Sequence, residues 1–298
     1  MKKYWLLPFF SLFALSVFGQ GHYPLLEAYA SGGYQSSDLN WSIAGNQNGT
    51  SPNILSEVKW RSVSGPLLHL GVQANIYDKL FIQGEYAKGY VKSGQANDTD
   101  YGEDNRRLPS YQADLDADEG NSKKYAVFAG YRIIENNKIW VTFTAGYSGL
   151  TQALLLLNHA EDVPGQKNLR STYNTQWRGP AAGISAEYQL LRRLTVNIAT
   201  RYTQATYQAL ADWNLIYAFK HPVSFKQKAD GYILEPAITF RYQLSNPVSI
   251  FIQGTYTHAE TGNGTDQLFL DSGNSQLTRF NGVASNMKSL MIGTRISY

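Results

Sequence analysis

The sequence predicts an all-β protein, a ten-stranded antiparallel transmembrane β-barrel. Three observations predict it. Apolar and polar residues alternate with a period of two along many segments, short and long connections alternate between those segments, and the chain ends on an alternating segment whose last residue is Tyr298. Beyond the N-terminus we find neither the spacing of an amphipathic helix nor the roughly 20-residue apolar run of a membrane-spanning helix.

The alternating segments justify individual strands. In residues 68–76, Leu68, Leu70 and Val72 alternate with His69 and Gln73, and the same dyad recurs in residues 194–202, 232–242 and 289–298. One face of each segment suits hydrocarbon and the other suits water, as in barrels whose strands separate lipid from a lumen.

The connections between strands are of two kinds. Four are tight, at residues 77–79, 135–138, 190–193 and 244–247, and five are long and polar, around residues 38–53, 99–120, 157–173, 213–224 and 262–283. Together they join ten strands, which enclose a narrow lumen that side chains largely fill, so a general porin is not expected. We expect charge pairs to plug this lumen, formed by Glu85, Glu187, Arg201, Glu235 and Arg241.

The first 19 residues have the layout of a secretory signal peptide. Lys2 and Lys3 precede an apolar run, and a small residue stands before Gln20. Residues 20–298 are then expected to form a single outer-membrane barrel domain. The chain has no cysteine, which excludes a disulfide framework, a lipoprotein anchor and thiolate chemistry. Without Lys2 and Lys3 the formal net charge falls from +3 to +1, so charge gives no argument for nucleic-acid binding.

A concentration of carboxylates occurs at residues 95–104, QANDTDYGED. Asp98 and Asp100 are two apart, so both side chains project from one face if the strand continues that far. Two carboxylates held this close can position a water or share a proton, because each raises the pKa of the other. A solvated turn would have the same composition, so this pair alone does not establish a site.

A second acidic group follows at Asp114, Asp116, Asp118 and Glu119. Its spacing begins like an EF-hand loop, but the glycine is one place late and a tyrosine stands where the twelfth-position glutamate is required. No EF-hand is therefore predicted, and a looser cation cluster stays open. We expect no cofactor and assign no metal ligand.

Over its mature length the chain resembles the omptin family of outer-membrane endopeptidases. The similarity lies in chain length, ten strands, SEVKW at residues 56–60 after a long first loop, and Asp-x-Asp-aromatic at residues 98–101 atop the third strand. The resemblance implies that Asp98 and Asp100 oppose a histidine–aspartate dyad across an external groove, written Asp-x-His atop the seventh strand. Here the matching positions are Asp212 and Asn214, so the aspartate is present and the histidine is asparagine.

This departure limits the chemistry that the resemblance implies. An asparagine amide can hold a water but cannot take its proton near pH 7. Losing a general base costs a factor of about 100 to 10,000 in rate, so we expect hydrolysis by the family's route to be severely impaired. Leu210 stands where omptins carry an acidic group that selects basic residues, so a preference for Arg or Lys is not expected.

The other histidines are expected to be structural or solvent-exposed. His221 lies near the tip of the loop that follows Asn214, where a solvent-exposed side chain is expected rather than a replacement base. Structural roles are expected for His69, His159 and His258.

Strand parity sets a condition on the site. Asp98 and Asp100 share the register of the lipid-facing Ile82 and Tyr86, and the pair at 212 and 214 likewise shares the register of a lipid-facing face. A bulge near Gly89, at Gly94 or within 203–211 is needed to turn each pair inward.

Three classes of function stay open. We favour an omptin-like barrel with a degenerate catalytic groove that binds a peptide or protein at the cell surface. The first alternative is an active endopeptidase that uses Asp98, Asp100 and Asp212 with water, and the second is a structural or small-solute barrel. The resemblance also implies lipopolysaccharide as a lipid partner. We expect a monomer in the bacterial outer membrane with extracellular loops.

Overall fold

A computed structural model describes residues 23–77 and 79–298. The signal peptide predicted for residues 1–19 lies outside the described residues. The described chain consists of strands, connections and one short 3-10 helix, η1 (His159–Glu161). No helix in this part of the chain is long and apolar enough to cross a membrane.

The strands are long and follow one another directly in sequence. They are β1 (Leu26–Ile43), β2 (Ser56–Tyr77), β3 (Leu80–Tyr90), β4 (Ser93–Glu103), β5 (Arg107–Asp116), β6 (Gly120–Glu135), β7 (Ile139–Leu157), β8 (Arg170–Leu191), β9 (Leu194–Asp212), β10 (Phe225–Gln243), β11 (Val248–Thr261), β12 (Gly264–Phe269) and β13 (Ser275–Ser297).

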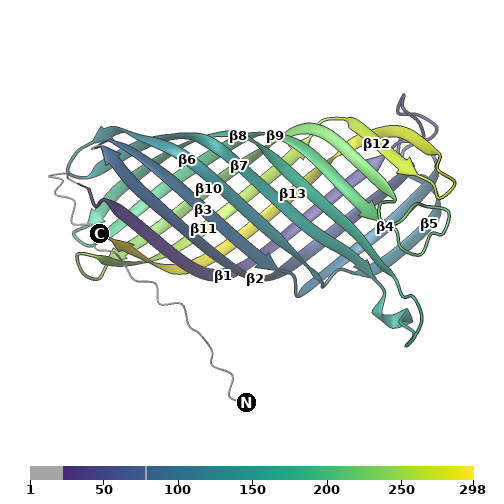
Figure 1. Ribbon diagram of the computed structural model, residues 1–298, viewed down its shortest axis with the longest axis horizontal. Coiled ribbons are helices and arrows are strands. Elements are labelled where there is room, and N and C mark those ends of the chain that lie inside the picture. The colour runs from purple at the N-terminus through teal and green to yellow at the C-terminus, as the bar shows by residue number, and fades with distance from the viewer. Residues whose placement is uncertain (1–22, 78) are drawn as a thin grey trace, which may run out of the picture.

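Ten of the described strands close into an antiparallel ring, in the order β1, β2, β3, β6, β7, β8, β9, β10, β11, β13 and back to β1 (Figure 1). The other three extend the wall at one end. β4 continues β3 and pairs with β2 and β5, whereas β12 lies between β10 and β13. The predicted ten-stranded antiparallel β-barrel is confirmed.

The two ends of the barrel differ in their connections. The four tight links occur where they were predicted and define what we call the turn end, on the left of Figure 1, while the long connections gather at the opposite loop end. Four predicted loops are partly strand. β1 runs to Ile43, residues 99–116 complete β4 and form β5, β8 already begins at Arg170, and β12 with the start of β13 occupies 264–283. These extensions lie beyond the apolar outer band, so they lack the lipid-facing residues on which the sequence prediction depended.

The outer wall carries the apolar band of a membrane barrel. Large side chains such as Leu68, Leu70, Ile198, Leu290 and Ile292 point outward and are exposed. Toward the loop end the band is bordered by outward tyrosines, as in the aromatic girdles of such barrels. The bordering tyrosines are Tyr34, Tyr86, Tyr125, Tyr147, Tyr202 and Tyr256.

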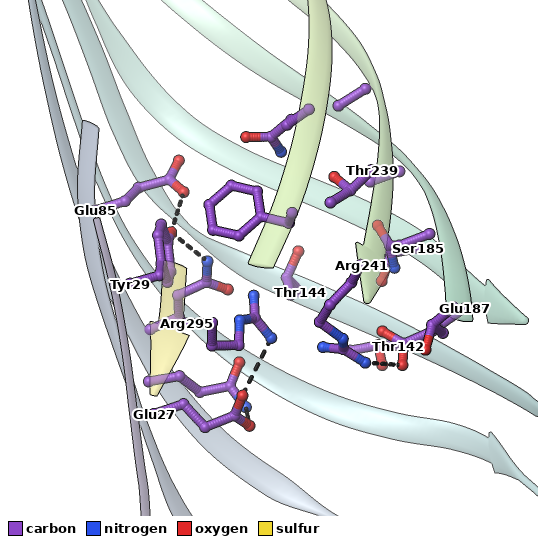
Figure 2. Close-up of a pocket in the computed structure, with 18 of the residues that line it drawn as sticks. Glu27, Tyr29, Glu85, Thr142, Thr144, Ser185, Glu187, Thr239, Arg241 and Arg295 are labelled. Atoms are coloured by element: carbon purple, nitrogen blue, oxygen red, sulfur yellow. Dashed lines mark hydrogen bonds and ion pairs between the residues drawn. The ribbon is translucent and has the colours of Figure 1, made fainter. Parts of the chain in front are cut away.

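The interior has two dissimilar halves. On the turn side, side chains line a polar cavity of about 1140 Å³. Charge pairs form there between Arg201 and Glu85 and between Lys124 and Glu235, and Figure 2 shows the pairs Arg241–Glu187 and Arg295–Glu27. The predicted charge pairs are therefore present, but they line a cavity and do not fill the lumen.

The loop half of the interior is filled by an aromatic core. Trp60, Tyr173, Trp177 and Phe280 are almost completely buried, and the rings of Trp60 and Tyr173 stack with centroids 5.1 Å apart. Burial of each such side chain contributes roughly 1.5–3 kcal/mol relative to exposure. Because this core fills the loop half of the interior, it limits the space that is left there for inward-pointing carboxylates.

Candidate functional site at the loop end

A register shift turns Asp98 and Asp100 toward the barrel interior. The pairing of β2 is irregular between Arg61 and Ser64, where Ser62 has φ +52°. On the turn side of this irregularity the odd-numbered residues Leu67 and Val63 point inward. On the loop side the even-numbered residues Trp60 and Val58 point inward instead. The paired strand shifts between β3 and β4, so that Val58 lies opposite Asp98.

Gly94 lies at this shift and requires the absence of a side chain. A Cβ at this position would lie 2.5 Å from the carbonyl oxygen of Ala117. The sequence condition that a bulge near this glycine turns the carboxylate pair inward is therefore met on β4.

The inward turn places Asp98 at the edge of the aromatic core. Only 7% of Asp98 is exposed, and its carboxylate has a hydrogen-bonding partner in the Trp213 side chain. Burial and, second, the charge of Asp100 raise the pKa of Asp98 to about 7, against the Trp213 hydrogen bond. Burial also raises the pKa of Asp100, and a hydrogen bond with Ser56 lowers it by a smaller amount. Both carboxyl groups of the pair therefore hold a proton to higher pH than an exposed aspartate does.

Tyr111 completes the surroundings of this pair. It lies directly opposite Asp100 on β5, on the same face of the sheet. Burial and the charges of Asp98, Asp100 and Glu161 raise the pKa of its hydroxyl, so this group stays protonated and can donate a hydrogen bond.

Asp212 faces the other way. β9 keeps one register against β10 throughout residues 194–211, so Tyr207, Ala209 and Ala211 point inward and Asp212 has the outward parity. No bulge occurs within 203–211, and the inward position at the strand end belongs to Trp213, which packs against the core. The family resemblance implies that Asp98 and Asp212 face each other across a groove. In the structure Asp98 lies on the inner face of the sheet and Asp212 has the parity of the outer face.

Asp212 binds His221, whose sequence context predicts only a solvent-exposed loop residue. His221 Nδ1 lies 2.5 Å from Asp212 Oδ1, and Ser224 Oγ donates to the same oxygen at 3.3 Å. The loop 213–224 returns to the sheet at Ser224, whose N–H bonds the carbonyl of Ala211. This return brings the end of the loop against its beginning, which no spacing rule in the sequence indicated.

Trp213 lies between the two groups. Its indole packs 4.7 Å from the ring of Phe225 and bonds Asp98, and its backbone N–H donates to Ser224 Oγ at 3.0 Å. Trp213 therefore contacts both Asp98 and Ser224, which in turn bonds Asp212.

Asn214 is occupied by backbone contacts. Its Oδ1 accepts from the N–H of Arg170 at 2.9 Å, and its Nδ2 donates to the carbonyl of Asn168 at 2.9 Å. Asn214 thereby ties the β9–β10 loop to the β7–β8 loop, while Leu210 pairs with Lys226 with the outward parity of the wall.

The second acidic group is used in loop contacts. Asp116 accepts from the N–H of His159, whose ring bridges Asp118 at 3.1 Å and Asp162 at 3.3 Å, and Glu119 pairs with Arg170. In the described part of the chain, no three His, Cys, Asp or Glu side chains are arranged to hold a metal ion.

The two other histidines in the described part of the chain, His69 and His258, also make local contacts. Nδ1 of His258 lies 2.8 Å from Asn286 Oδ1, and the His69 ring lies edge-on to Tyr29 inside the barrel with centroids 5.2 Å apart. Neither contact involves the loop-end carboxylates.

Known proteins resemble this chain in its fold. The crystal structure of the outer membrane protease OmpT from Escherichia coli superposes with a TM-score of 0.71 at 10% sequence identity, covering 92% of this chain and 96% of OmpT. The translocator domain of the autotransporter NalP from Neisseria meningitidis reaches 0.40 at 12% identity, covering 95% and 91%. No curated protein matches the sequence. The OmpT likeness supports an omptin-like transmembrane barrel. A family model, that of the Protochlamydia outer membrane protein (Pom), matches residues 29–298, so the chain belongs to this family and is an outer-membrane β-barrel.

Proposed function

We propose that this barrel binds a peptide or protein ligand at its loop end, on the extracellular side, without hydrolysing it by the omptin route. The observation that carries the proposal is that the Asp98–Asp100 pair and the Asp212–His221 pair lie on opposite faces of the barrel wall. Asp98 lies on the inner face beside the aromatic core, while Asp212 with His221 has the outer parity.

Hydrolysis by the omptin route requires that the aspartate pair and the histidine–aspartate dyad both contact the same water molecule. A general base must lie within hydrogen-bond reach of the water that it deprotonates. Trp213 fills the position between the pairs and takes up a hydrogen bond of Asp98, and Asn214 is engaged with Arg170 and Asn168. These contacts favour the degenerate groove over the active endopeptidase.

The loop end offers side chains suited to binding. Leu108 is 63% exposed, Tyr111 49% and Tyr217 79%, and the neighbouring Leu215 and Ile216 are exposed as well. Exposed apolar and aromatic residues outside the lipid band, beside a carboxylate pair, have the composition of a recognition surface.

A cleavage assay tests the proposal directly. A peptide library is incubated with the protein in lipopolysaccharide-containing micelles, using wild type, Asp98→Ala and His221→Ala, with His159→Ala as a control outside the site. We expect no cleavage by any of them. Cleavage by wild type and by His159→Ala that disappears in both Asp98→Ala and His221→Ala would establish the endopeptidase instead.

A small-solute barrel is the second candidate function, favoured by the charge of the turn-side cavity. Eight Lys and Arg side chains line it against five Glu, an excess of three positive charges that would favour small anions. The aromatic core blocks the loop half. Single-channel recording in planar bilayers tests this candidate, and a steady anion-selective current through wild type would favour it over ligand binding.

Lipopolysaccharide is the lipid partner that we propose. Lys88 and Lys123 lie directly opposite each other on the outer wall, one step beyond the outward pair Tyr86–Tyr125. Directly opposed like charges are destabilising, and among the described residues no acidic side chain pairs with either lysine. A lipid phosphate at the band edge would neutralise both. The variant Lys88→Gln/Lys123→Gln should retain less lipopolysaccharide on purification, and equal retention would exclude this location.

A further inference from the structure

β5 leaves one edge of the sheet without a partner. Along one side it pairs with β4 from Arg107 to Asp116. On the other side, within residues 23–77 and 79–298, its only pairing is the single bridge from Asp116 to Leu157 of β7. Among the described residues, no backbone or side-chain group bonds the other edge between 110 and 115. Figure 1 shows the β4–β5 hairpin at the loop end of the barrel.

The hydrogen bonds to β4 identify which backbone groups face this free edge. Ala117 N–H donates to the carbonyl of Gly94, and the carbonyl of Ala113 accepts from Asn97 Nδ2 at 3.3 Å, so residues of this parity face β4. Backbone direction alternates along an antiparallel strand. Gln112 and Asp114 therefore direct their N–H and C=O groups away from β4, into solvent.

The faces of this segment are open as well. Residues 107–112 are exposed on both sides of the strand, because the hairpin projects beyond the aromatic core. Such an edge can pair with another strand. In this binding mode an extended peptide forms main-chain hydrogen bonds to the edge, and every second side chain of the peptide contacts the protein. Tyr111 supplies an aromatic contact on the inner side, next to Asp98 and Asp100.

We propose that the free edge of β5, residues 110–115, binds an extended peptide segment of a partner protein by adding it to the sheet as a further strand. The proposal rests on the proposed ligand-binding function and gives it a location and a mode. An edge of six residues spans about 20 Å, enough for a short extended segment.

The position of the edge favours a single strand over a second barrel. The edge points along the barrel wall toward the β7–β8 loop, which is tied to the end of β5 by the bond from His159 N–H to Asp116. A second copy would have to bring its whole wall into this space. Pro109, which lacks an N–H, and Arg107 at the start of β5 also oppose edge-to-edge pairing of two copies.

Carboxylates gather toward the C-terminal end of the site, whereas Arg107 lies at the start of β5. Asp114, Asp118, Glu161 and Asp162 lie on β5 or on the loops beside its end, and His159 is shared between two of them. A segment with a net positive charge therefore fits the edge better than an acidic one.

Peptide selection followed by backbone methylation tests the proposal. Short random peptides displayed on phage are selected on the full-length barrel in lipid nanodiscs, and the best binder is synthesised with each backbone nitrogen methylated in turn. Methylation at every second residue should weaken binding about tenfold, because each methyl removes one main-chain hydrogen bond. Methylation at the intervening residues should change it little.

Variants of the barrel give a matched control at one position. Gln112→Pro removes the outward N–H and should weaken binding about tenfold, whereas Gln112→Ala keeps the N–H and should bind like wild type. The heat-modifiable migration of folded barrels in gel electrophoresis verifies that both variants fold. Hydrogen exchange should show protection of residues 110–115 by the peptide.

The outcomes separate this proposal from the function on which it rests. A binder that protects other loop-end residues, or that tolerates methylation at all positions, would overturn the β5 edge and leave ligand binding intact. Failure to select any binder would overturn both.

Discussion

The two halves of the barrel interior handle charge in opposite ways. In the turn half, carboxylates face basic partners across a cavity of about 1140 Å³, as in Glu85 with Arg201 and Glu235 with Lys124. In the loop half, Trp60, Tyr173, Trp177 and Phe280 fill the same cross-section of the barrel. The outer wall of the turn half meets lipid, whereas the wall of the loop half extends beyond the apolar band.

The contrast explains the state of the carboxylate at the boundary of the aromatic core. Asp98 lies against that core and feels the charge of the acidic Asp100, and no basic side chain pairs with it among the described residues. A buried carboxylate without a cation keeps its proton to higher pH. A carboxylate is thus paired with a basic side chain in the turn half, whereas Asp98, at the edge of the loop half, has a raised pKa.

The largest expected effect comes from opening the aromatic core. Trp177→Ala should lower the free energy of unfolding by about 5 kcal/mol, because it leaves a cavity among completely buried rings. Trp140→Ala, which trims a side chain lining the turn-side cavity, should cost clearly less. Urea unfolding in lipid vesicles measures both. Equal losses would contradict the division of the interior into a packed half and a hydrated half.

The next effect is a pH dependence that belongs to Asp98. Its pKa in the folded protein is about 7, above its unfolded value of 3.8, so the folded state binds the proton more tightly. Its stabilising contribution is complete below about pH 4 and is lost as pH rises toward and through 7, with an upper limit of about 4 kcal/mol.

Asp98→Asn should flatten this part of the stability profile. Unfolding curves collected between pH 4 and 8 for wild type and Asp98→Asn provide the comparison, with Asp38→Asn on the outer face as the control. A wild-type profile as flat as that of Asp98→Asn would show that Asp98 is ionised throughout this range.

The ion pairs of the turn half should be less costly to break. Arg201→Met leaves Glu85 without its guanidinium partner and should cost about 2 kcal/mol, since water in the cavity solvates part of the charge. Replacing both partners, as Arg201→Met/Glu85→Gln, should recover much of the loss. Urea unfolding again measures the differences, and a double variant no more stable than the single one would mean that the pair does not act as a unit.

The barrel was predictable because its signals are local and repeated. The lipid-facing dyad, the four tight turns and the aromatic end each depend only on neighbouring residues, and the ring of ten strands follows from them. The inward turn of Asp98 was predictable as a condition, since strand parity required a shift near Gly94. Its partner strand shifts at Ser62, a non-glycine residue with positive φ that carries no sequence signal.

The far side of the site was less predictable for a physical reason. Whether Asp212 or Trp213 takes the inward position depends on packing against Phe225, at the start of the neighbouring β10, and against Trp41, on the distant β1. The contact between His221 and Asp212 depends on how the loop 213–224 closes, and tertiary contacts decide this. Spacing along the chain could suggest Asp212 as a site residue, but it could not predict whether its side chain points into or out of the barrel.

The smallest expected effect concerns Asn214 and distinguishes a loop tie from a lost catalytic group. Asn214→Ala removes the bonds to Arg170 and Asn168 and should cost about 1 kcal/mol locally, with faster hydrogen exchange in residues 158–169 and little change in global unfolding. Asn214→His should behave similarly, because its ring cannot reproduce both bonds and does not face Asp98. Peptidase activity gained in Asn214→His would show instead that the loop end still holds a groove lacking one group, and that the packing of Trp213 against Asp98 yields to substrate.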